Sequence, residues 1–195
     1  MVLGLYYLTS NRKVDNKKVY YYNTEDDVFR DYDYGIITLH TPIKLKVNKN
    51  VITTTVGKIL FNRTLPDDYR FINKEIDKKT LISIISDCIN RYSTSVVTEL
   101  LDRVKETGFH YSTKSGLTIG IDDIEIPDKK YTILESVEKK IEKIESFYRD
   151  GLITDDERHQ KVIQIWSQAS DSVAATMEKN FDKFNSVYMM ATSGA

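Results

Sequence analysis

The sequence predicts an α+β protein with a small mixed β-hairpin and helix domain, a helical region and a projecting antiparallel coiled-coil hairpin. Three patterns predict this fold class. Apolar and polar residues alternate with period two on both sides of residues 48–50, as in a β-hairpin. Helical spacing dominates residues 77–107, and two seven-residue apolar repeats follow it. We therefore expect four regions: a mixed region 1–66, a helical region 67–127, the long hairpin 128–180 and a return segment 181–195.

The mixed region contains strand signals and one short helix. Residues 18–22 are typical of a strand, and 23–27 of a capped helix start with acidic residues at its N-terminus. Gly35 would close that helix. Two further strands, 43–47 and 51–55, would be joined by the three-residue loop 48–50, and Lys44 and Lys46 would lie on their exposed face.

The helical region is predicted to hold two helices. Asp77 can cap the first, which would run through Ile82, Ile85 and Ile89, with Cys88 as a buried, inert thiol. The second covers 95–107 and would end at Gly108. Its apolar side consists of Val96, Val97, Leu100, Leu101 and Val104. Residues 114–127 are expected to be loop and short extended structure, stopped by Pro127.

The long hairpin is the strongest structural signal. Its first arm has apolar positions at Leu134, Val137, Ile141, Ile144 and Tyr148, and its second at Val162, Trp166, Ala169, Val173 and Thr176. Gly151 suits the left-handed position after a helix, and Thr154 with Glu157 forms a capping-box pattern. A short link forces such arms to run antiparallel, seam against seam.

Composition excludes several classes of protein. The 195 residues carry a net charge of −1, with 41% hydrophobic and 29% charged residues, which gives no general reason to expect duplex binding. A single cysteine indicates a reducing compartment, and no apolar run approaches the length of a membrane span. We expect a cytoplasmic protein with no membrane partner. The apolar start and small-residue end look like cuts in a longer polypeptide.

Autonomous catalytic chemistry is not indicated. His40, His110 and His159 are not paired at metal-ligand spacing, and there is no phosphate loop or nucleophile elbow. Asp122 and Asp123, with Glu125, could hold magnesium, but capping or solvent exposure is the favoured interpretation because adjacent residues on an extended segment face opposite sides. The 13 tyrosines could stack on bases, although Tyr20, Tyr21 and Tyr22 lack interleaved basic residues and fit sheet packing better.

The hairpin end allows two interpretations. Leu152 and Ile153 are apolar residues at a tip, and Glu157, Arg158 and Lys161 follow closely. They could fold back onto the seam beside a solvated charged face. Alternatively, they could form a small docking knob whose charged neighbours orient a partner.

Several motifs along the chain match one known family in order, at residues 1–9, 54–62, 107–109, 115–116, 120–123, 126–127, 157–158, 161–163, Trp166 and 185–191. Together they resemble the pore and funnel segment of the bacterial β′ subunit of DNA-directed RNA polymerase. The resemblance implies that the hairpin is the pair of rim helices at the mouth of the secondary channel, where nucleoside triphosphates enter and backtracked RNA exits. The family's magnesium-holding loop, bridge helix and trigger loop are not in this stretch, which implies no cofactor here and no activity alone.

The resemblance also assigns roles to individual residues. Gre-type cleavage factors or similar regulators would contact Leu152, Ile153, Glu157, Arg158 and Lys161. The pore would be lined by Tyr188, Met189, Met190 and Ser193. Other polymerase subunits would be permanent partners, and nucleic acid would be contacted only within the whole enzyme.

The resemblance weakens at a second alarmone site known in some members of the family. The matching positions are Asp102, Glu106, His159, Gln160, Lys161 and Gln164. Only Asp102 and Lys161 keep the pattern. Its aromatic residues become Glu106 and His159, its asparagine becomes Gln160 and its aspartate becomes Gln164. We predict that this site is weak or absent.

Two rival hypotheses for the function of the chain are a free-standing coiled-coil adaptor and a nucleic-acid-binding module. The second would bind nucleic acid with steep salt dependence.

Overall fold

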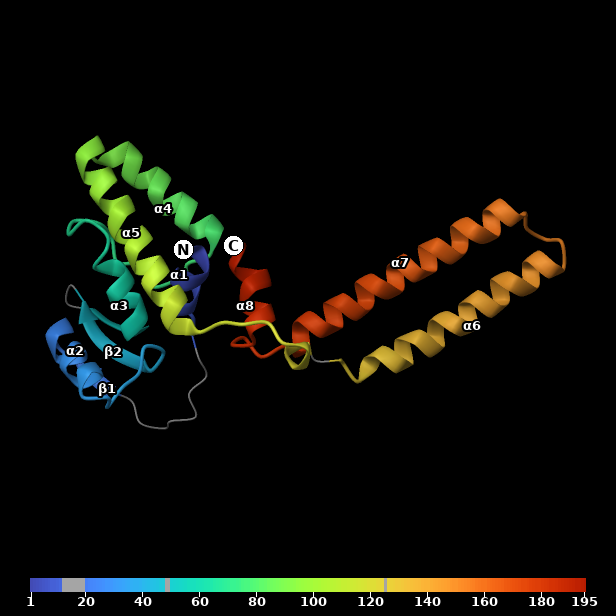
Figure 1. Ribbon diagram of the computed structural model, residues 1–195, viewed down its shortest axis with the longest axis horizontal. Coiled ribbons are helices and arrows are strands. Elements are labelled where there is room, and N and C mark those ends of the chain that lie inside the picture. Colours follow the sequence, from blue (N-terminus) through green and yellow to red (C-terminus); the bar gives the residue numbers. More distant parts are fainter. Residues whose placement is uncertain (12–19, 48–49, 125) are drawn as a thin grey trace. The chain divides into compact units, whose positions relative to one another are not determined.

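The computed structural model describes residues 1–11, 20–47, 50–124 and 126–195 (Figure 1). The described residues fall into two compact units, which we call the base unit (1–119 with 186–195) and the hairpin unit (120–185). In the described part of the chain, no helix combines the length and the apolar character needed to cross a membrane.

The base unit mixes helices with one small sheet. Its elements are α1 (Val2–Thr9), β1 (Tyr20–Tyr22), α2 (Glu25–Asp33), β2 (Pro42–Val47), β3 (Asn50–Thr55), α3 (Val56–Asn62), α4 (Lys78–Arg91), α5 (Thr94–Ser115) and α8 (Ser186–Ser193). The hairpin unit consists of a short 3₁₀ helix, η1 (Ile121–Asp123), and two long helices, α6 (Lys129–Arg149) and α7 (Asp155–Asn180). The predicted α+β class is confirmed.

The sheet has three strands in the order β1-β2-β3. β2 and β3 pair antiparallel, with Ile43 opposite Thr54, as the alternation predicts. β1 runs parallel to β2, and of its predicted residues 18–22 the first two lie outside the described residues. The predicted loop 48–50 is wrong by one residue because Asn50 already pairs with Val47. Residues 48–49 also lie outside the described part.

Two apolar clusters stabilise the base unit. One packs the sheet against α2 and α3, and its buried members are Val28, Ile37, Ile43, Leu45, Val56 and Ile59. The other joins α1, α3, α4 and α5 around Leu5, Leu8 and Phe61. The predicted start of α2 is confirmed, since the Thr24 side chain accepts a hydrogen bond from the Asp27 amide. Its predicted end is also confirmed, because Gly35 has φ +70°.

Helix α4 begins as predicted but buries a different face. The Asp77 carboxylate caps it by accepting a hydrogen bond from the Thr80 amide at 2.8 Å. Leu81, Ile84 and Cys88 are buried, and burial raises the pKa of the Cys88 thiol, as expected for an inert cysteine. By contrast, Ile82 and Ile89 are 56% and 57% exposed. The sequence offers two apolar faces here, so periodicity alone does not choose between them.

The predicted end of the second helix at Gly108 is wrong. Helix α5 continues to Ser115 and ends at Gly116, which has φ +59°. Gly108 instead provides room for α1. A Cβ atom built on Gly4 would lie 1.9 Å from the Gly108 carbonyl oxygen, and one on Gly108 would lie 2.7 Å from Met1 Cγ. Glycine is needed here for close helix packing.

In the hairpin unit, α6 and α7 are joined by a short turn and run antiparallel in contact with each other (Figure 1). Val137 and Ala169 are buried in this contact, and Ile141, Ile144 and Val162 are half-buried, as the seam predicts. Two predicted seam residues are not buried: Trp166 is 42% exposed, and Tyr148 is 41% exposed but contacts Arg158 of the other arm. Ile165 is half-buried in place of Trp166; spacings of three and four are both helical, so the pattern permits either.

Candidate partner-binding site

The tip of the hairpin is closed by backbone hydrogen bonds. Helix α6 ends with the Gly151 amide donating to the Tyr148 carbonyl at 3.0 Å and the Leu152 amide donating to the Phe147 carbonyl at 2.9 Å. Gly151 has φ +71°, so this is the Schellman arrangement, which satisfies carbonyls at the end of a helix. The predicted left-handed glycine is confirmed, and it turns the chain sharply away from α6.

The start of α7 is fixed by side chains. The Glu157 amide donates to Thr154 Oγ1 at 3.3 Å, and the Thr154 amide donates to Glu157 Oε2 at 3.0 Å. The predicted capping box is therefore confirmed. The Glu157 carboxylate therefore stabilises the start of α7, because one of its oxygens accepts a hydrogen bond from the backbone of the tip.

Arg158 connects the two arms. Its Nη2 donates to Asp155 Oδ1 at 2.7 Å within α7, and its Nη1 donates to Glu145 Oε1 at 2.9 Å across the hairpin. The guanidinium also lies over the Tyr148 ring, 5.1 Å from its centroid. The hydrogen bonds to Asp155 and then Glu145 raise the pKa of Arg158. We call Arg158, Asp155, Glu145 and Tyr148 the tip clamp.

The structure separates the predicted partner-binding residues into two groups. Glu157 and Arg158 are engaged in the capping box and the tip clamp, and Ile153 is half-buried. Leu152 is 68% exposed, and Lys161 is exposed without an ion-pair partner among the described residues. Of the five predicted residues, Leu152 and Lys161 are thus the two that a partner can contact without disturbing the bonds of the tip.

Sequence reasoning missed the partners of Arg158. The contact with Asp155 is a three-residue spacing on one helix and could have been identified from the sequence. Glu145 and Tyr148 belong to the other arm, and only the register of the hairpin brings them to Arg158. Phe147, which is 45% exposed, is an additional apolar side chain near the tip that the seam pattern does not include.

The predicted pore-lining residues all lie on or at the end of α8 in the base unit, and α8 contacts α1. Met189 and Ser193 are buried, with no exposed surface. Tyr188 and Met190 are half-buried. The nearby Thr192 hydroxyl donates to the Tyr6 hydroxyl oxygen at 3.2 Å and ties α8 to α1. Of the four residues, only Tyr188 and Met190 are partly exposed to solvent.

The acidic segment after α5 has a local structural role. The Gly120 amide donates to Asp123 Oδ2 at 2.7 Å, so Asp123 caps η1. Asp122 is exposed, and Glu125 lies outside the described residues. Within the described ranges, no group of three or more His, Cys, Asp and Glu side chains lies close enough together to hold a metal ion.

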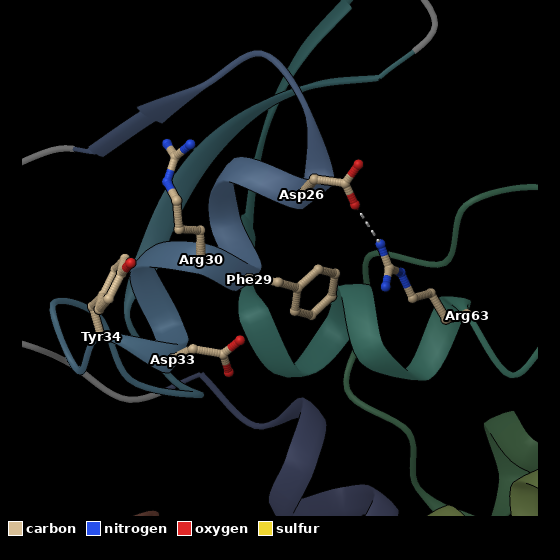
Figure 2. Close-up of a pocket in the computed structure, with 6 residues that line it drawn as sticks. All are labelled: Asp26, Phe29, Arg30, Asp33, Tyr34 and Arg63. Carbon is tan, nitrogen blue, oxygen red and sulfur yellow. Dashed lines mark hydrogen bonds and ion pairs between the residues drawn. The ribbon is translucent and has the colours of Figure 1, made fainter.

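A shallow hollow of about 440 Å³ lies over α2 and the end of α3, lined by Asp26, Phe29, Arg30, Asp33, Tyr34 and Arg63 (Figure 2). The Arg63 guanidinium pairs with Glu25 at 3.1 Å and Asp26 at 3.4 Å, and it stacks on Phe29 at 4.0 Å. Arg30 pairs with Asp27 at 3.0 Å. These arginines are already paired with neighbouring carboxylates, so they hold α2 against the end of α3 and leave little positive charge for a ligand.

Comparison with known proteins identifies the family. The family described as RNA polymerase Rpb1, domain 3, matches residues 1–124. All 195 residues align with the β′ subunit of DNA-directed RNA polymerase from Desulforamulus reducens at 46% identity and from Pelotomaculum thermopropionicum at 43%. The chain belongs to the bacterial β′ family. It spans 16% and 17% of the length of these two relatives, so it corresponds to one segment of a β′ subunit.

The residues of the second alarmone pattern fall in both units. Asp102 lies on α5 and forms an ion pair with Lys105 at 2.6 Å. His159, Gln160, Lys161 and Gln164 lie on the first turns of α7 and are exposed. That this site is weak or absent in this β′ segment stays a prediction.

Proposed function

We propose that this chain is a non-catalytic segment of a β′ subunit that shapes the secondary channel of RNA polymerase and docks transcript-cleavage factors or similar regulators during transcription. The family membership supports the first part. The single observation that supports docking is the bonded tip: a Schellman turn, a capping box and the tip clamp hold the backbone at the end of the hairpin while Leu152 remains 68% exposed. Because this backbone is already ordered by hydrogen bonds, covering Leu152 with a partner costs little further backbone entropy.

The tip has the layout of a small interface. Leu152 supplies an apolar anchor, and Lys161 supplies a surface positive charge that has no ion-pair partner within the described ranges. Apolar anchors at the centre of an interface contribute most of the affinity, and peripheral charges set orientation and association rate. Gre-type factors are the proposed partners, with other polymerase subunits as permanent neighbours and the cytoplasm as the compartment.

The proposal also includes lining of the pore, but it restricts the lining to two of the four residues predicted on α8. Tyr188 and Met190 are proposed to face the channel, because Met189 and Ser193 are buried within the base unit. The adaptor hypothesis would explain the hairpin alone, and among the described residues no contact favours it over the β′ assignment. We further propose that the chain has no polymerase activity alone; nucleotide addition by the purified chain would contradict this.

Docking is tested by measuring the affinity of a Gre-type factor for the full chain and for Leu152→Asp and Lys161→Glu. We expect Leu152→Asp to weaken binding about tenfold or more because it places a charge in the apolar contact, and Lys161→Glu to weaken it about threefold to tenfold. Matched controls are Ile121→Asp, at an isoleucine that is 90% exposed, and Lys140→Glu, on the exposed surface of α6.

The result that contradicts docking is equal affinity for all five proteins. A loss shared by tip and control variants would also contradict it, because the tip would then have no special part. Glu157 and Arg158 are unsuited to this test, since changing either one also disturbs the hairpin end.

A further inference from the structure

The three-stranded sheet of the base unit has one covered face and one open face. Its covered face packs against α2 and α3 through an apolar cluster that includes Ile43 and Leu45. Side chains along a strand point alternately to the two faces, so the residues between these lie on the other side. We call this second surface the open sheet face. Its side chains are Tyr21 of β1, Lys44 and Lys46 of β2, and Val51 and Thr53 of β3.

The strand register groups the side chains of the open sheet face. Tyr21 lies opposite Lys44, and Val51 lies opposite Lys46. Side chains directly opposite each other on neighbouring strands are close enough to interact. Tyr21 is 67% exposed and Val51 is 62% exposed. The two lysines of the central strand are therefore flanked by an exposed aromatic ring on one side and an exposed aliphatic side chain on the other.

The positive charge of this face is not balanced by neighbouring acidic side chains. The Lys44 ammonium donates to the Tyr21 hydroxyl at 3.1 Å and lies 4.9 Å from the centre of its ring, and Lys46 is exposed. Within the described ranges, neither lysine lies within ion-pair distance of a carboxylate. By contrast, acidic residues at the start of α2 pair with Arg63 of α3. The open sheet face is thus locally positive, although the net charge of the chain is −1.

The spacing of the two lysines specifies what could bind them. Lys44 and Lys46 are two residues apart on one strand, so their side chains leave the sheet roughly 7 Å apart. An extended chain has the same two-residue period. Acidic side chains at alternate positions of a segment lying along β2 would therefore meet both ammonium groups, and charge-assisted hydrogen bonds are stronger than neutral ones. The methylene groups of such side chains could pack against Tyr21 and Val51.

A nucleic acid fits this face less well than a protein segment. Proteins that bind single strands combine a basic groove along the backbone with aromatic rings on which bases stack. The open sheet face has only two cations, and the Lys44 ammonium already lies over the Tyr21 ring, which restricts stacking on it. Carboxylates need only the two ammonium groups.

The mixed composition of the face favours a reversible contact with a separate chain. Permanent interfaces are more apolar and resemble a domain core cut in half. Here the centre of the surface is occupied by Lys44 and Lys46, and Thr53 adds a further exposed polar side chain. Tyr21 and Val51 are apolar contributions at its sides. Such a surface can remain in water when the partner is absent.

We propose that the open sheet face binds an extended acidic segment of a separate partner protein, whose acidic side chains at alternate positions pair with Lys44 and Lys46. Tyr21 and Val51 would contact the aliphatic parts of these side chains. The surface lies wholly in the base unit and uses none of the tip residues. Its failure would leave the docking proposal for the tip unaffected, and the reverse also holds.

The experiment measures binding of fluorescently labelled peptides to the full chain by anisotropy. The probe peptide has Glu at every second position and Thr between. A second peptide has the same composition with its Glu residues contiguous, so that neighbouring carboxylates point to opposite sides of an extended chain. The test variant is Lys44→Glu with Lys46→Glu. The matched control, Lys139→Glu with Lys140→Glu on exposed positions of α6, changes the net charge equally.

We expect the wild type and the α6 control to bind the alternating peptide equally, and the test variant to lose affinity about tenfold or more. The contiguous peptide should bind the wild type about threefold more weakly or worse. Lys44→Gln with Lys46→Gln should give an intermediate loss and guards against misfolding caused by charge reversal. Raising the salt concentration should weaken binding because these charges are at the surface.

Four results would overturn the proposal. They are unchanged affinity in the test variant, no binding by the wild type, and equal affinity for the two peptides. The fourth is tighter binding of a labelled single-stranded RNA that the test variant loses, which would make the face a nucleic-acid site. The alternating peptide is also tested on an RNA polymerase assembled with this β′ segment. Binding to the chain but not to the assembled enzyme would contradict a separate partner, because the face would then be covered within the polymerase.

Discussion

Two helix pairs in this protein are held together in opposite ways. In the base unit, α1 crosses α5 at Gly4 and Gly108, where a single methyl group on Gly4 would lie 1.9 Å from a backbone oxygen. In the hairpin unit, α6 and α7 are joined by side chains that are mostly half-buried, from Val137 to the tip clamp. The α1–α5 contact depends on the absence of side chains at two glycines, whereas the α6–α7 contact is made by side chains.

This difference explains which parts of the fold the sequence could predict. A seam of apolar residues leaves a periodic pattern, so the hairpin arms were predictable. A close crossing leaves only a glycine in each helix, and a glycine in a helical pattern is as typical of a helix end as of a tight contact. Gly108 was therefore predicted to end a helix that continues past it to Ser115.

The largest effect should come from closing the α1–α5 crossing. Gly4→Ala places a Cβ atom against two backbone atoms of α5, Gly108 O at 1.9 Å and Ser112 N at 2.5 Å, so the helices must separate. We expect the base unit to lose about 3 kcal/mol or more of its free energy of unfolding, measured by urea denaturation. Gly120→Ala is the control, because its nearest atom lies at 3.5 Å, and it should change little.

A smaller but clear effect is expected from a charge in the seam of the hairpin. Ile144 is half-buried, so Ile144→Asp removes apolar contact and places a carboxylate between the arms; we expect a loss of about 2 kcal/mol. Loss of helical circular dichroism and a change in fluorescence of Trp166, the single tryptophan, would report it. Ile163→Asp is the matched control at a residue that is 54% exposed. Equal damage by both changes would show that the seam is not what holds the arms.

Breaking the tip clamp should cost less. Arg158→Ala removes the bonds to Asp155 and Glu145 and the contact with Tyr148, but these groups are partly exposed, so we expect a loss of hairpin stability smaller than that of Ile144→Asp. Arg158→Lys should recover only part of the lost stability, because an ammonium group cannot bond both carboxylates at once as the planar guanidinium does. Thermal unfolding of both variants beside Lys140→Ala tests this, and a full recovery by Lys would contradict the clamp.

The smallest effect is expected at Tyr22, whose hydroxyl donates to Asp31 Oδ2 at 2.8 Å. Tyr22→Phe should lower stability by about 0.5–1 kcal/mol at neutral pH. Burial, and then the hydrogen bond to Asp31, raise the pKa of Tyr22 in the folded protein. Since the unfolded tyrosine ionises first, the advantage of the wild type is complete below about pH 10 and declines above it. A difference between the two proteins that stays constant through alkaline pH would refute this linkage.

The candidate site shows the same division between local and distant information. Gly151, Thr154 and Glu157 were predictable because turns and caps are made by residues three or four apart in the chain. The engagement of Arg158 with Glu145 was not, because it depends on how the arms are aligned. The exposed state of Leu152 and the burial of Met189 and Ser193 likewise follow from packing, which no local pattern encodes.

The sequence by itself determined the fold class, the β-hairpin, the caps of α2, α4 and α7, and the existence of two long arms, because each follows from short-range spacing and backbone preference. Only the tertiary structure decided which face of α4 is buried, that Gly108 lies in a helix crossing, and that Arg158 bridges the hairpin arms. These features depend on distances between residues far apart in the chain, and such distances exist only once the helices have packed.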